Sequence, residues 1–265
     1  MTKTIHFIAG LPRAGSTMVA NILKQNPDIH GEAVSSLSSL IASVHASWYS
    51  YDTNKEYENP HAKIGVLRGI LDGYHAHIDK PIIFDKDRQW ISQIGLLESI
   101  LDRPVKILCM VRNPAEILAS FEKIRKHNPL FFTLPDQSLR EGSTVASRAF
   151  FYASPQGALG LAHANLKDAL TMGYSNRLLF VDYNRFCNSP KSQTKRIYEF
   201  FDIPLFEHNF KQIEQTEQYN DIAVGLPNLH AVKSSVDRTT VNCVEYLGLD
   251  LYQQYNAQIF WDALI

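Results

Sequence analysis

One stretch near the N-terminus decides the fold: residues 4–17 read TIHFIAGLPRAGST. The run TIHFIA is mostly apolar without regular polar alternation, which is typical of a β-strand buried on both faces. Gly10 and Pro12 then interrupt the strand pattern, and the apolar spacing over residues 16–25 predicts a helix. The segment is therefore expected to form a strand, a tight glycine loop and a helix.

The loop has the composition of an anion-binding site. Gly10 and Gly15 have four residues between them, which is the spacing of the nucleotide-binding P-loop. A helix that begins after such a turn presents backbone N–H groups and a positive dipole end to an anion. Ser16 stands where the P-loop has its lysine, Arg13 is the cation of the loop, and Thr17 keeps the hydroxyl. We expect phosphate binding without the contacts that the lysine makes to a nucleoside triphosphate.

The same strand–loop–helix pattern recurs along the chain. Apolar runs at 81–84, 105–111 and 178–181 are each followed by a loop and a helical pattern, at 90–101, 114–126 and 189–201. Repeated units of this kind predict right-handed crossovers and a parallel sheet. The expected fold class is α/β, a P-loop-type doubly wound parallel sheet with helices on both faces.

The length and composition are consistent with one domain. The chain has 265 residues, of which 45% are hydrophobic, enough for a sizeable core. We expect a single domain over residues 1–265, with helical insertions near 35–80 and 127–172. Residues 219–248 show no pattern that assigns them to an element.

Charge and cysteine usage narrow the class of protein. Lys and Arg number 26 and Asp and Glu number 27, a net charge of −1, which argues against a dedicated nucleic-acid binder. Cys109, Cys187 and Cys243 are too far apart in sequence for a CxxC metal site or a disulfide framework, which indicates a reducing compartment. Since no apolar run reaches the length of a membrane span, a cytoplasmic protein is expected.

A second candidate anion site follows the third apolar run. Arg112 lies where this buried strand should end, and ligands of open parallel sheets bind at the carboxyl ends of strands. Pro114 suits the first turn of a helix because proline has no N–H to satisfy. Ser120 lies about two turns further along that helix, from where it could share a phosphate with Arg112.

Two of the segments described above resemble those of a known family. The segments GLPRAGSTMVANIL (10–23) and RNPAEILASF (112–121) look like those of the sulfotransferases that use 3′-phosphoadenosine-5′-phosphosulfate (PAPS), in the bacterial and tyrosylprotein-type branch. Matching pieces occur in family order at 5–32, 81–90, 105–121 and 178–206, and more weakly at 230–256.

The resemblance implies which residues hold PAPS, whose product is adenosine 3′,5′-bisphosphate. The first loop would hold the 5′-phosphosulfate, and the groups after the third strand would hold the 3′-phosphate. The implied cofactor-binding residues are Arg13, Ala14, Gly15, Ser16, Thr17, Arg112, Ser120, Tyr183 and Lys233.

The resemblance also implies the catalytic groups Lys86, Glu32 and Arg13. A lysine after the second apolar run would approach the bridging oxygen, although Lys86 could instead pair with its flanking aspartates. Glu32 would take the proton of the acceptor, with His30 and Asp85 as substitutes. A phosphate leaving group held by a loop demands no metal ion. The motif HAH at 75–77 supplies none either, because helical residues two apart face different ways; both histidines are expected to face solvent.

The expected activity is in-line transfer of a sulfuryl group to a hydroxyl or amine of a small-molecule, carbohydrate or peptide acceptor. The acceptor pocket is expected in the variable segments 35–60 and 127–157, and the available aromatic residues are Trp48, Tyr49, Tyr51, Phe131 and Phe132. Two alternatives stay open. One is a P-loop-type kinase with Asp85 as its magnesium ligand. The other is an inactive cofactor-binding homologue, suggested by Ala33 beside Glu32.

Overall fold

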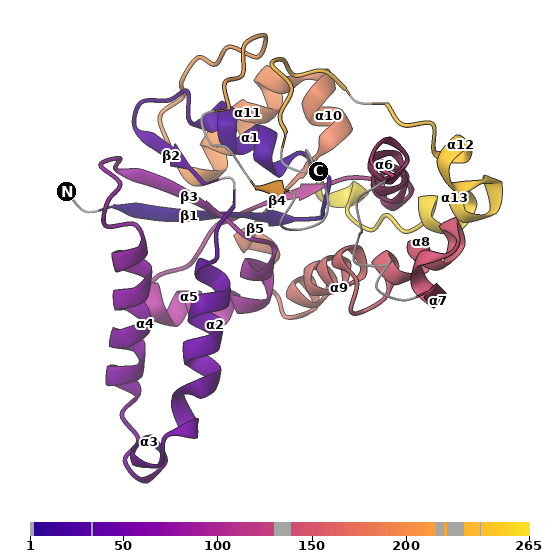
Figure 1. Cartoon of the computed structure of the whole chain (residues 1–265). Helices are drawn as coiled ribbons and strands as arrows, with labels where there is room; N and C mark the ends of the chain where they lie inside the picture. The colour runs from indigo at the N-terminus through magenta and orange to yellow at the C-terminus, as the bar shows by residue number, and fades with distance from the viewer. Residues whose placement is uncertain (1–2, 33, 130–138, 216–219, 222–230, 239) are drawn as a thin grey trace.

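The protein is built on one parallel β-sheet (Figure 1). The computed structural model describes residues 3–32, 34–129, 139–215, 220–221, 231–238 and 240–265. The strands are β1 (Thr4–Gly10), β2 (Ile29–Gly31), β3 (Ile82–Lys86), β4 (Ile107–Val111) and β5 (Leu178–Asp182), in the order β2-β3-β1-β4-β5. All four pairings are parallel. The segment that decided the fold therefore forms the central strand, β1.

Helices cover both faces of the sheet, which confirms the expected α/β class. In Figure 1, α1 (Ser16–Leu23), α10 (Tyr183–Asn188) and α11 (Pro190–Phe201) lie on one face, and α5 (Ile94–Leu101) and α9 (Ala158–Thr171) lie on the other. Both faces of the central strands are buried, as at Phe7 and Ile8 of β1. This double burial explains why the strands read as apolar runs without polar alternation.

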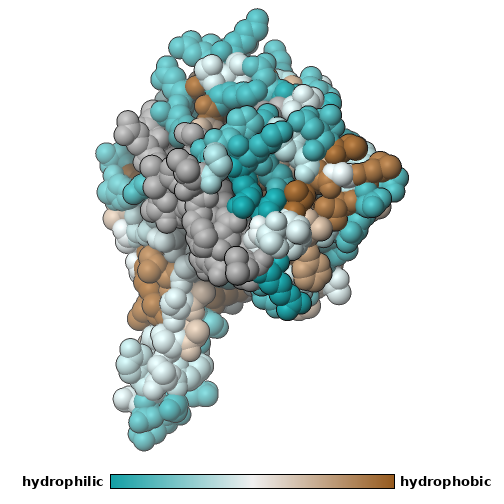
Figure 2. All heavy atoms as spheres, turned by 45° about the vertical axis from the view of Figure 1, so that its right-hand side comes forward, coloured by the Kyte–Doolittle hydropathy of each residue, from teal (hydrophilic) through white to brown (hydrophobic). Residues whose placement is uncertain are grey.

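The first insertion forms a hairpin that projects from the body (Figure 1). Its long helices are α2 (Leu37–Ser47) and α4 (Pro60–Tyr74), joined by the 3₁₀ turn η1 (Trp48–Ser50) and the short helix α3 (Asp52–Glu56). Asn59 caps α4 by accepting a hydrogen bond from the Ala62 N–H at 2.9 Å, and Pro60 occupies its first turn. The far end of the hairpin is hydrophilic (Figure 2).

Most of the remaining helices lie beyond the carboxyl ends of the strands (Figure 1). The remaining helices are α6 (Pro114–His127), α7 (Leu139–Gly142), α8 (Val145–Ala153), α12 (Cys243–Leu247) and α13 (Leu249–Asn256), with 3₁₀ turns η4 (Ser175–Arg177) and η6 (Asp262–Leu264). Helices α12 and α13 pack on α6. Within the described part of the chain, no helix combines the length and apolar character that crossing a membrane requires.

Three elements differ from the sequence expectations. Residues 29–31 form the short edge strand β2, which the sequence did not predict, and pairing continues as the Glu32 N–H donates to the Phe84 carbonyl at 2.8 Å. Helix α10 begins directly after β5 because Asp182 caps it, accepting from the Arg185 N–H at 3.0 Å. The helix expected over 90–101 starts as a 3₁₀ segment, η2 (Arg88–Gln93), before α5.

Candidate active site

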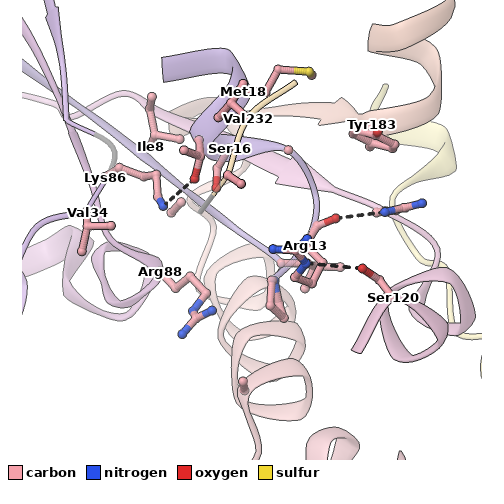
Figure 3. Close-up of a pocket in the computed structure, with 18 of the residues that line it drawn as sticks. Ile8, Arg13, Ser16, Met18, Val34, Lys86, Arg88, Ser120, Tyr183 and Val232 are labelled. Atoms are coloured by element: carbon pink, nitrogen blue, oxygen red, sulfur yellow. Dashed lines mark hydrogen bonds between the residues drawn. The ribbon is translucent and has the colours of Figure 1, made fainter. Parts of the chain in front are cut away.

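A cavity of about 540 Å³ opens at the carboxyl ends of the strands (Figure 3), where parallel α/β sheets bind ligands. Most of the residues implied by the resemblance meet there. The cavity is lined by Arg13, Gly15, Ser16, Thr17, Lys86, Arg112, Ser120, Tyr183 and Lys233. Ala14 belongs to the same loop but is completely buried, so that its backbone rather than its side chain can serve a ligand.

The loop after β1 takes its shape from two glycines. Gly10 has a φ of 114° and Gly15 a φ of 84°, and both values lie in the left-handed region that glycine tolerates. A Cβ atom on Gly10 would lie 2.1 Å from the Met110 carbonyl oxygen. The Leu11 N–H donates to that same oxygen at 2.8 Å, which fixes the loop against β4. Gly15 caps α1 without a side-chain hydrogen bond, so that the helix N-terminus faces the cavity as an anion site.

Arg13 links the first loop to the second candidate anion site. Its φ is 58°, an uncommon value for a residue other than glycine. Its Nε donates to the Ser120 hydroxyl at 3.3 Å, and Arg112 Nη1 donates to the Arg13 carbonyl at 3.3 Å. Burial and the neighbouring Arg112 lower the pKa of Arg13. The two arginines therefore lie close enough to bind one small molecule.

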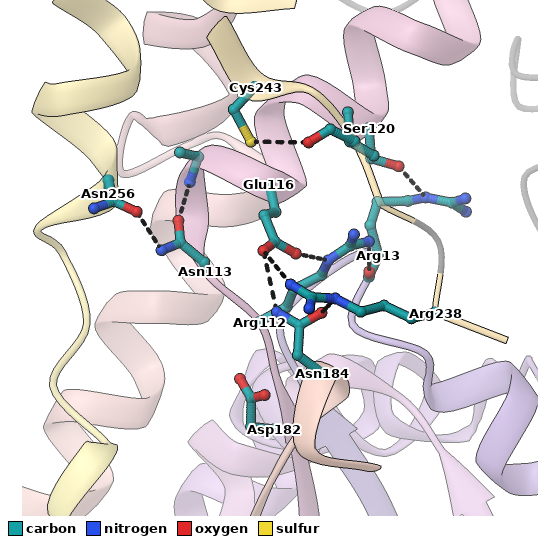
Figure 4. A network of polar contacts seen from close by, with 12 residues as sticks. Arg13, Arg112, Asn113, Glu116, Ser120, Asp182, Asn184, Arg238, Cys243 and Asn256 are labelled. Atoms are coloured by element: carbon teal, nitrogen blue, oxygen red, sulfur yellow. Dashed lines mark hydrogen bonds and ion pairs between the residues drawn. The ribbon is translucent and has the colours of Figure 1, made fainter. Parts of the chain in front are cut away.

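Arg112 is held in a polar network (Figure 4). Its Nε donates to the Glu116 carboxylate at 2.8 Å, and its guanidinium lies 4.4 Å from the centre of the Tyr183 ring. The other oxygen of Glu116 accepts from Asn184 at 3.1 Å, and Arg238 donates to the Asn184 side-chain oxygen at 3.0 Å. The network fixes the plane of the Arg112 guanidinium, which favours directional recognition of a phosphate.

Lys86 ends β3 and extends towards the first loop. Its Nζ donates to the Thr17 hydroxyl at 3.4 Å. Burial and, secondarily, the positive charge of Arg88 lower the pKa of Lys86 to about 8. A lysine with such a pKa can donate a proton near neutral pH. No hydrogen bond or ion pair between described residues joins Lys86 to the flanking aspartates.

Glu32 does not join these residues in the cavity lining. Its carboxylate lies 3.3 Å from His30 Nε2. One of its carboxylate oxygens also lies within 4.8 Å of a ring nitrogen of His75 and of a carboxylate oxygen of Asp85. The β2–β3 register places His30 beside Ile83 and therefore Glu32 beside Asp85, one residue before Lys86. Since side chains alternate along a strand, Glu32 and Asp85 project to the face opposite Lys86.

Asp85 is an internal anchor rather than a cavity residue. Its carboxylate is completely buried and accepts from the Trp90 indole at 2.7 Å and from the Ser35 hydroxyl at 2.7 Å. His75 Nε2 lies 3.2 Å from the same carboxylate. The expectation that both histidines of HAH face solvent is therefore wrong for His75, which is buried because α4 ends at Tyr74 and turns this residue towards the sheet.

Two residues of the cavity, Arg88 and Phe121, were not predicted from the sequence, whereas Tyr152 lies in the segment 127–157 where the acceptor pocket was expected. Arg88 lines the cavity, and the signal for it is its spacing. Asp87 has an extended backbone with φ −147° and ψ 141°, so that residues 86 and 88 project to the same side. Phe121 and Tyr152 also line the cavity, and their rings stack with centroids 4.3 Å apart.

Three of the five aromatic residues expected in the acceptor pocket, Trp48, Tyr49 and Tyr51, lie in the projecting hairpin. Trp48 and Tyr49 belong to η1 in the projecting hairpin, and Tyr51 follows it. Of the described residues that line the cavity, none comes from this turn. Phe131 and Phe132 lie outside the described residues.

Comparison with known proteins identifies the family. A model of the sulfotransferase family matches residues 6–208, and the chain belongs to this family. A sulfotransferase domain from the curacin biosynthetic pathway is similar over 94% of this chain and 92% of its own, with a TM-score of 0.58 and 16% identity. The sulfotransferase domain from the Synechococcus PCC 7002 olefin synthase is similar over 89% and 85%, with a TM-score of 0.53 and 19% identity. None of the curated proteins matches the chain.

Proposed function

We propose that the protein is a PAPS-dependent sulfotransferase that transfers a sulfuryl group to an acceptor hydroxyl or amine. One observation carries the proposal: Arg13 and Arg112 come from the ends of different strands and meet in one cavity, where Arg112 donates to the Arg13 carbonyl at 3.3 Å. Two adjacent arginines suit a ligand with separated phosphate groups. Family membership supports sulfuryl transfer as the chemistry.

The residues of the cavity fit the two anionic ends of PAPS. The N-terminus of α1, Arg13 and Thr17 would hold the 5′-phosphosulfate through backbone N–H groups, a guanidinium and a hydroxyl. Arg112 and Ser120 would hold the 3′-phosphate, which distinguishes PAPS from ATP. Tyr183 supports the Arg112 guanidinium, and Lys233, which is exposed at the cavity wall, adds a cation.

The bound cofactor would supply the sulfuryl group and a phosphate leaving group. The protein then has to position the partners and stabilise the charge that develops on the leaving oxygen. Lys86 is suited to this task because its ammonium group lies beside Thr17 and has a lowered pKa. The carboxylates among the described lining residues are Asp87 and Asp237, and Asp87 directly follows Lys86. We therefore assign removal of the acceptor proton to Asp87 in place of Glu32.

No observation favours the kinase alternative. Ser16 replaces the P-loop lysine, and the Asp85 carboxylate is engaged by Trp90 and Ser35 inside the core. A magnesium ion would have to displace these donors.

Calorimetry with adenosine 3′,5′-bisphosphate and with AMP tests the cofactor assignment. We expect the wild type to bind the bisphosphate at least about tenfold more tightly than AMP, because the 3′-phosphate adds charge-assisted hydrogen bonds. Arg112→Gln should remove this preference, whereas Arg68→Gln, on the projecting hairpin, should keep it. Equal binding of the two nucleotides by the wild type would contradict the assignment.

A further inference from the structure

Arg88 is a cation of the cavity wall with no assigned task. It is the first residue of η2, two positions after Lys86 at the end of β3. In Figure 3 the Arg88 side chain lies on the same side of the cavity as Val34, away from Ser120 and Tyr183. It is therefore separated from the group of residues proposed to hold the 3′-phosphate.

No hydrogen bond or ion pair joins the Arg88 side chain to another residue of the described ranges. The adjacent carboxylate is already engaged, since Asp87 accepts from the Ser38 hydroxyl at 2.5 Å and from the Gln89 N–H at 2.9 Å. Although Arg88 is accessible to solvent, the surrounding protein lowers the pKa of its guanidinium, an effect that Asp87 opposes. A guanidinium in a concave wall without an anionic hydrogen-bond partner is suited to binding an anion from outside the chain.

The cofactor does not require Arg88 if the proposed function is correct. The first loop, Arg13, Lys86 and Arg112 already face the anionic groups of PAPS. Lys86 marks the end at which the sulfuryl group would be transferred, and in Figure 3 Arg88 lies on the same side of the cavity as Lys86, across from Ser120 and Tyr183. A ligand group that reaches Arg88 therefore belongs to the acceptor.

An apolar wall completes the cavity. The rings of Phe121 and Tyr152 are nearly parallel, with an interplanar angle of 8°, and Val34 and Ala158 also line the cavity. Such a surface favours an acceptor with an apolar body. The cation then selects acceptors that carry a negative charge at one end.

We propose that Arg88 binds the carboxylate of the acceptor, so that the natural acceptor is a hydroxy acid with an apolar body. This inference rests on the proposed function, because it assigns the acceptor of the same cavity. Arg88 is thus a specificity residue.

Matched acceptors test the proposal. Transfer from PAPS is measured with 4-hydroxyphenylacetate and 3-hydroxydecanoate, and with the neutral amide of each. We expect the wild type to prefer at least one acid over its amide by about tenfold or more in kcat/KM. Arg88→Gln should reduce this ratio to near one, and Arg88→Lys should keep part of it because the charge remains. Arg68→Gln, which removes an exposed arginine paired with Asp72 on α4, is the control and should keep the full ratio.

Each other outcome has a defined meaning. If neither acid is a substrate, calorimetry with the bisphosphate-loaded protein decides, and no binding of either acid overturns the proposal. Equal use of acid and amide by the wild type also overturns it. So does a preference for 4-hydroxybenzylphosphonate over the carboxylate, which would assign a phosphorylated acceptor.

If Arg88→Gln weakens bisphosphate binding as strongly as Arg112→Gln, Arg88 belongs to the cofactor site. If the wild type does not bind the bisphosphate at all, the proposed function fails and this inference fails with it.

Discussion

At the scale of the residue, Lys86 shows how position determines chemistry. A solvated lysine is almost fully protonated at neutral pH and transfers its proton poorly. Burial at the end of β3 and the nearby Arg88 lower the pKa of Lys86 to about 8. The ammonium form then dominates below that pH, and the group can both stabilise and protonate a leaving oxygen near neutrality.

The pH dependence of activity follows from this pKa. Lys86 is cationic below about pH 8 and neutral above it, so that kcat/KM should fall as the pH rises through that value. Lys86→Ala should lower kcat by roughly 10²- to 10³-fold, the usual loss for one group that stabilises a transition-state charge. Lys86→Arg should abolish the alkaline limb, because arginine stays charged. Initial rates between pH 6 and 10 check this, and an alkaline limb that persists in Lys86→Arg would assign it to another group.

Proton removal from the acceptor can be assigned by a second pair of variants. Asp87 lines the cavity, whereas Glu32 projects to the opposite face of the sheet, beside His30. We expect Asp87→Asn to lower kcat by about 10²-fold or more and Glu32→Gln to leave kcat within about twofold of wild type. Because Asp87 also caps η2 through the Gln89 N–H, the thermal unfolding of both variants is measured alongside the rates. Loss of activity in Glu32→Gln alone would restore Glu32 as the base.

At the scale of the element, the two glycines of the first strand–loop–helix unit have different tasks: Gly10 serves the stability of the fold and Gly15 serves ligand binding. Gly10 lies against the backbone of β4, where a Cβ atom would meet the Met110 oxygen at 2.1 Å. Gly15 lies against the Tyr183 side chain, which a Cβ atom would approach to 2.8 Å. The backbone beside Gly10 cannot move aside as the Tyr183 side chain beside Gly15 can, so the clash at Gly10 would be the more severe. Both glycines also have positive φ, which strains any other residue at these positions.

Alanine variants of these glycines should therefore differ in effect. Gly10→Ala should destabilise the fold by roughly 3 kcal/mol or more, because strain and a backbone clash add. Gly15→Ala should cost about 1–2 kcal/mol of stability but should weaken bisphosphate binding by about tenfold or more, because it displaces the Tyr183 ring beside Arg112. Denaturant unfolding and calorimetry measure the two effects. A Gly15→Ala variant with full affinity would show that the loop needs no glycine at this position.

The Asp85 carboxylate is one of the polar groups that attach the projecting hairpin to the sheet. Asp85 of β3 accepts from Ser35 before α2 and from Trp90 of η2, and it lies 3.2 Å from His75 at the end of α4. Asp85→Ala should lower the free energy of unfolding by about 3–5 kcal/mol, because the buried Trp90 indole and the partly buried Ser35 hydroxyl lose their acceptor and the buried His75 loses the adjacent carboxylate. His75→Ala should cost less, and the exposed His77→Ala almost nothing. Chemical denaturation ranks the three, and equal stabilities would contradict this role of Asp85.

These elements also show what the sequence could predict. Strands β1, β3, β4 and β5 were predictable because each is buried on both faces and reads as an apolar run. Strand β2 was not, because the edge strand at residues 29–31 is too short to show a period. In the site, Arg13 and Arg112 were predictable from their places after strands. The orientation of Glu32 depends on the β2–β3 register, and a single sequence does not reveal the register of an edge strand.

At the scale of the whole molecule, stability depends on histidines held neutral in the core. His6 of β1 packs against the rings of Phe84 and Phe201, with centroids 5.3 Å and 4.7 Å away. Burial, with smaller contributions from Arg103 and Lys106, lowers the pKa of His6 to about 3. Burial likewise lowers the pKa of His208, to about 4. The native state therefore excludes protons that the unfolded chain binds below about pH 6.5.

These lowered pKa values determine how the free energy of unfolding changes with pH. Between the unfolded and folded pKa values the unfolded state holds more protons, so that the free energy of unfolding rises with pH and is lost on acidification. Between pH 7 and 5.5 each of the two histidines should remove roughly 1 kcal/mol. His6→Leu keeps an apolar group against Phe84 and Phe201 and should remove about half of this combined loss. Urea unfolding of the wild type and the variant at both pH values measures the difference. An identical pH dependence in the two proteins would show that His6 is protonated in the fold, against its position between two aromatic rings and near Arg103 and Lys106.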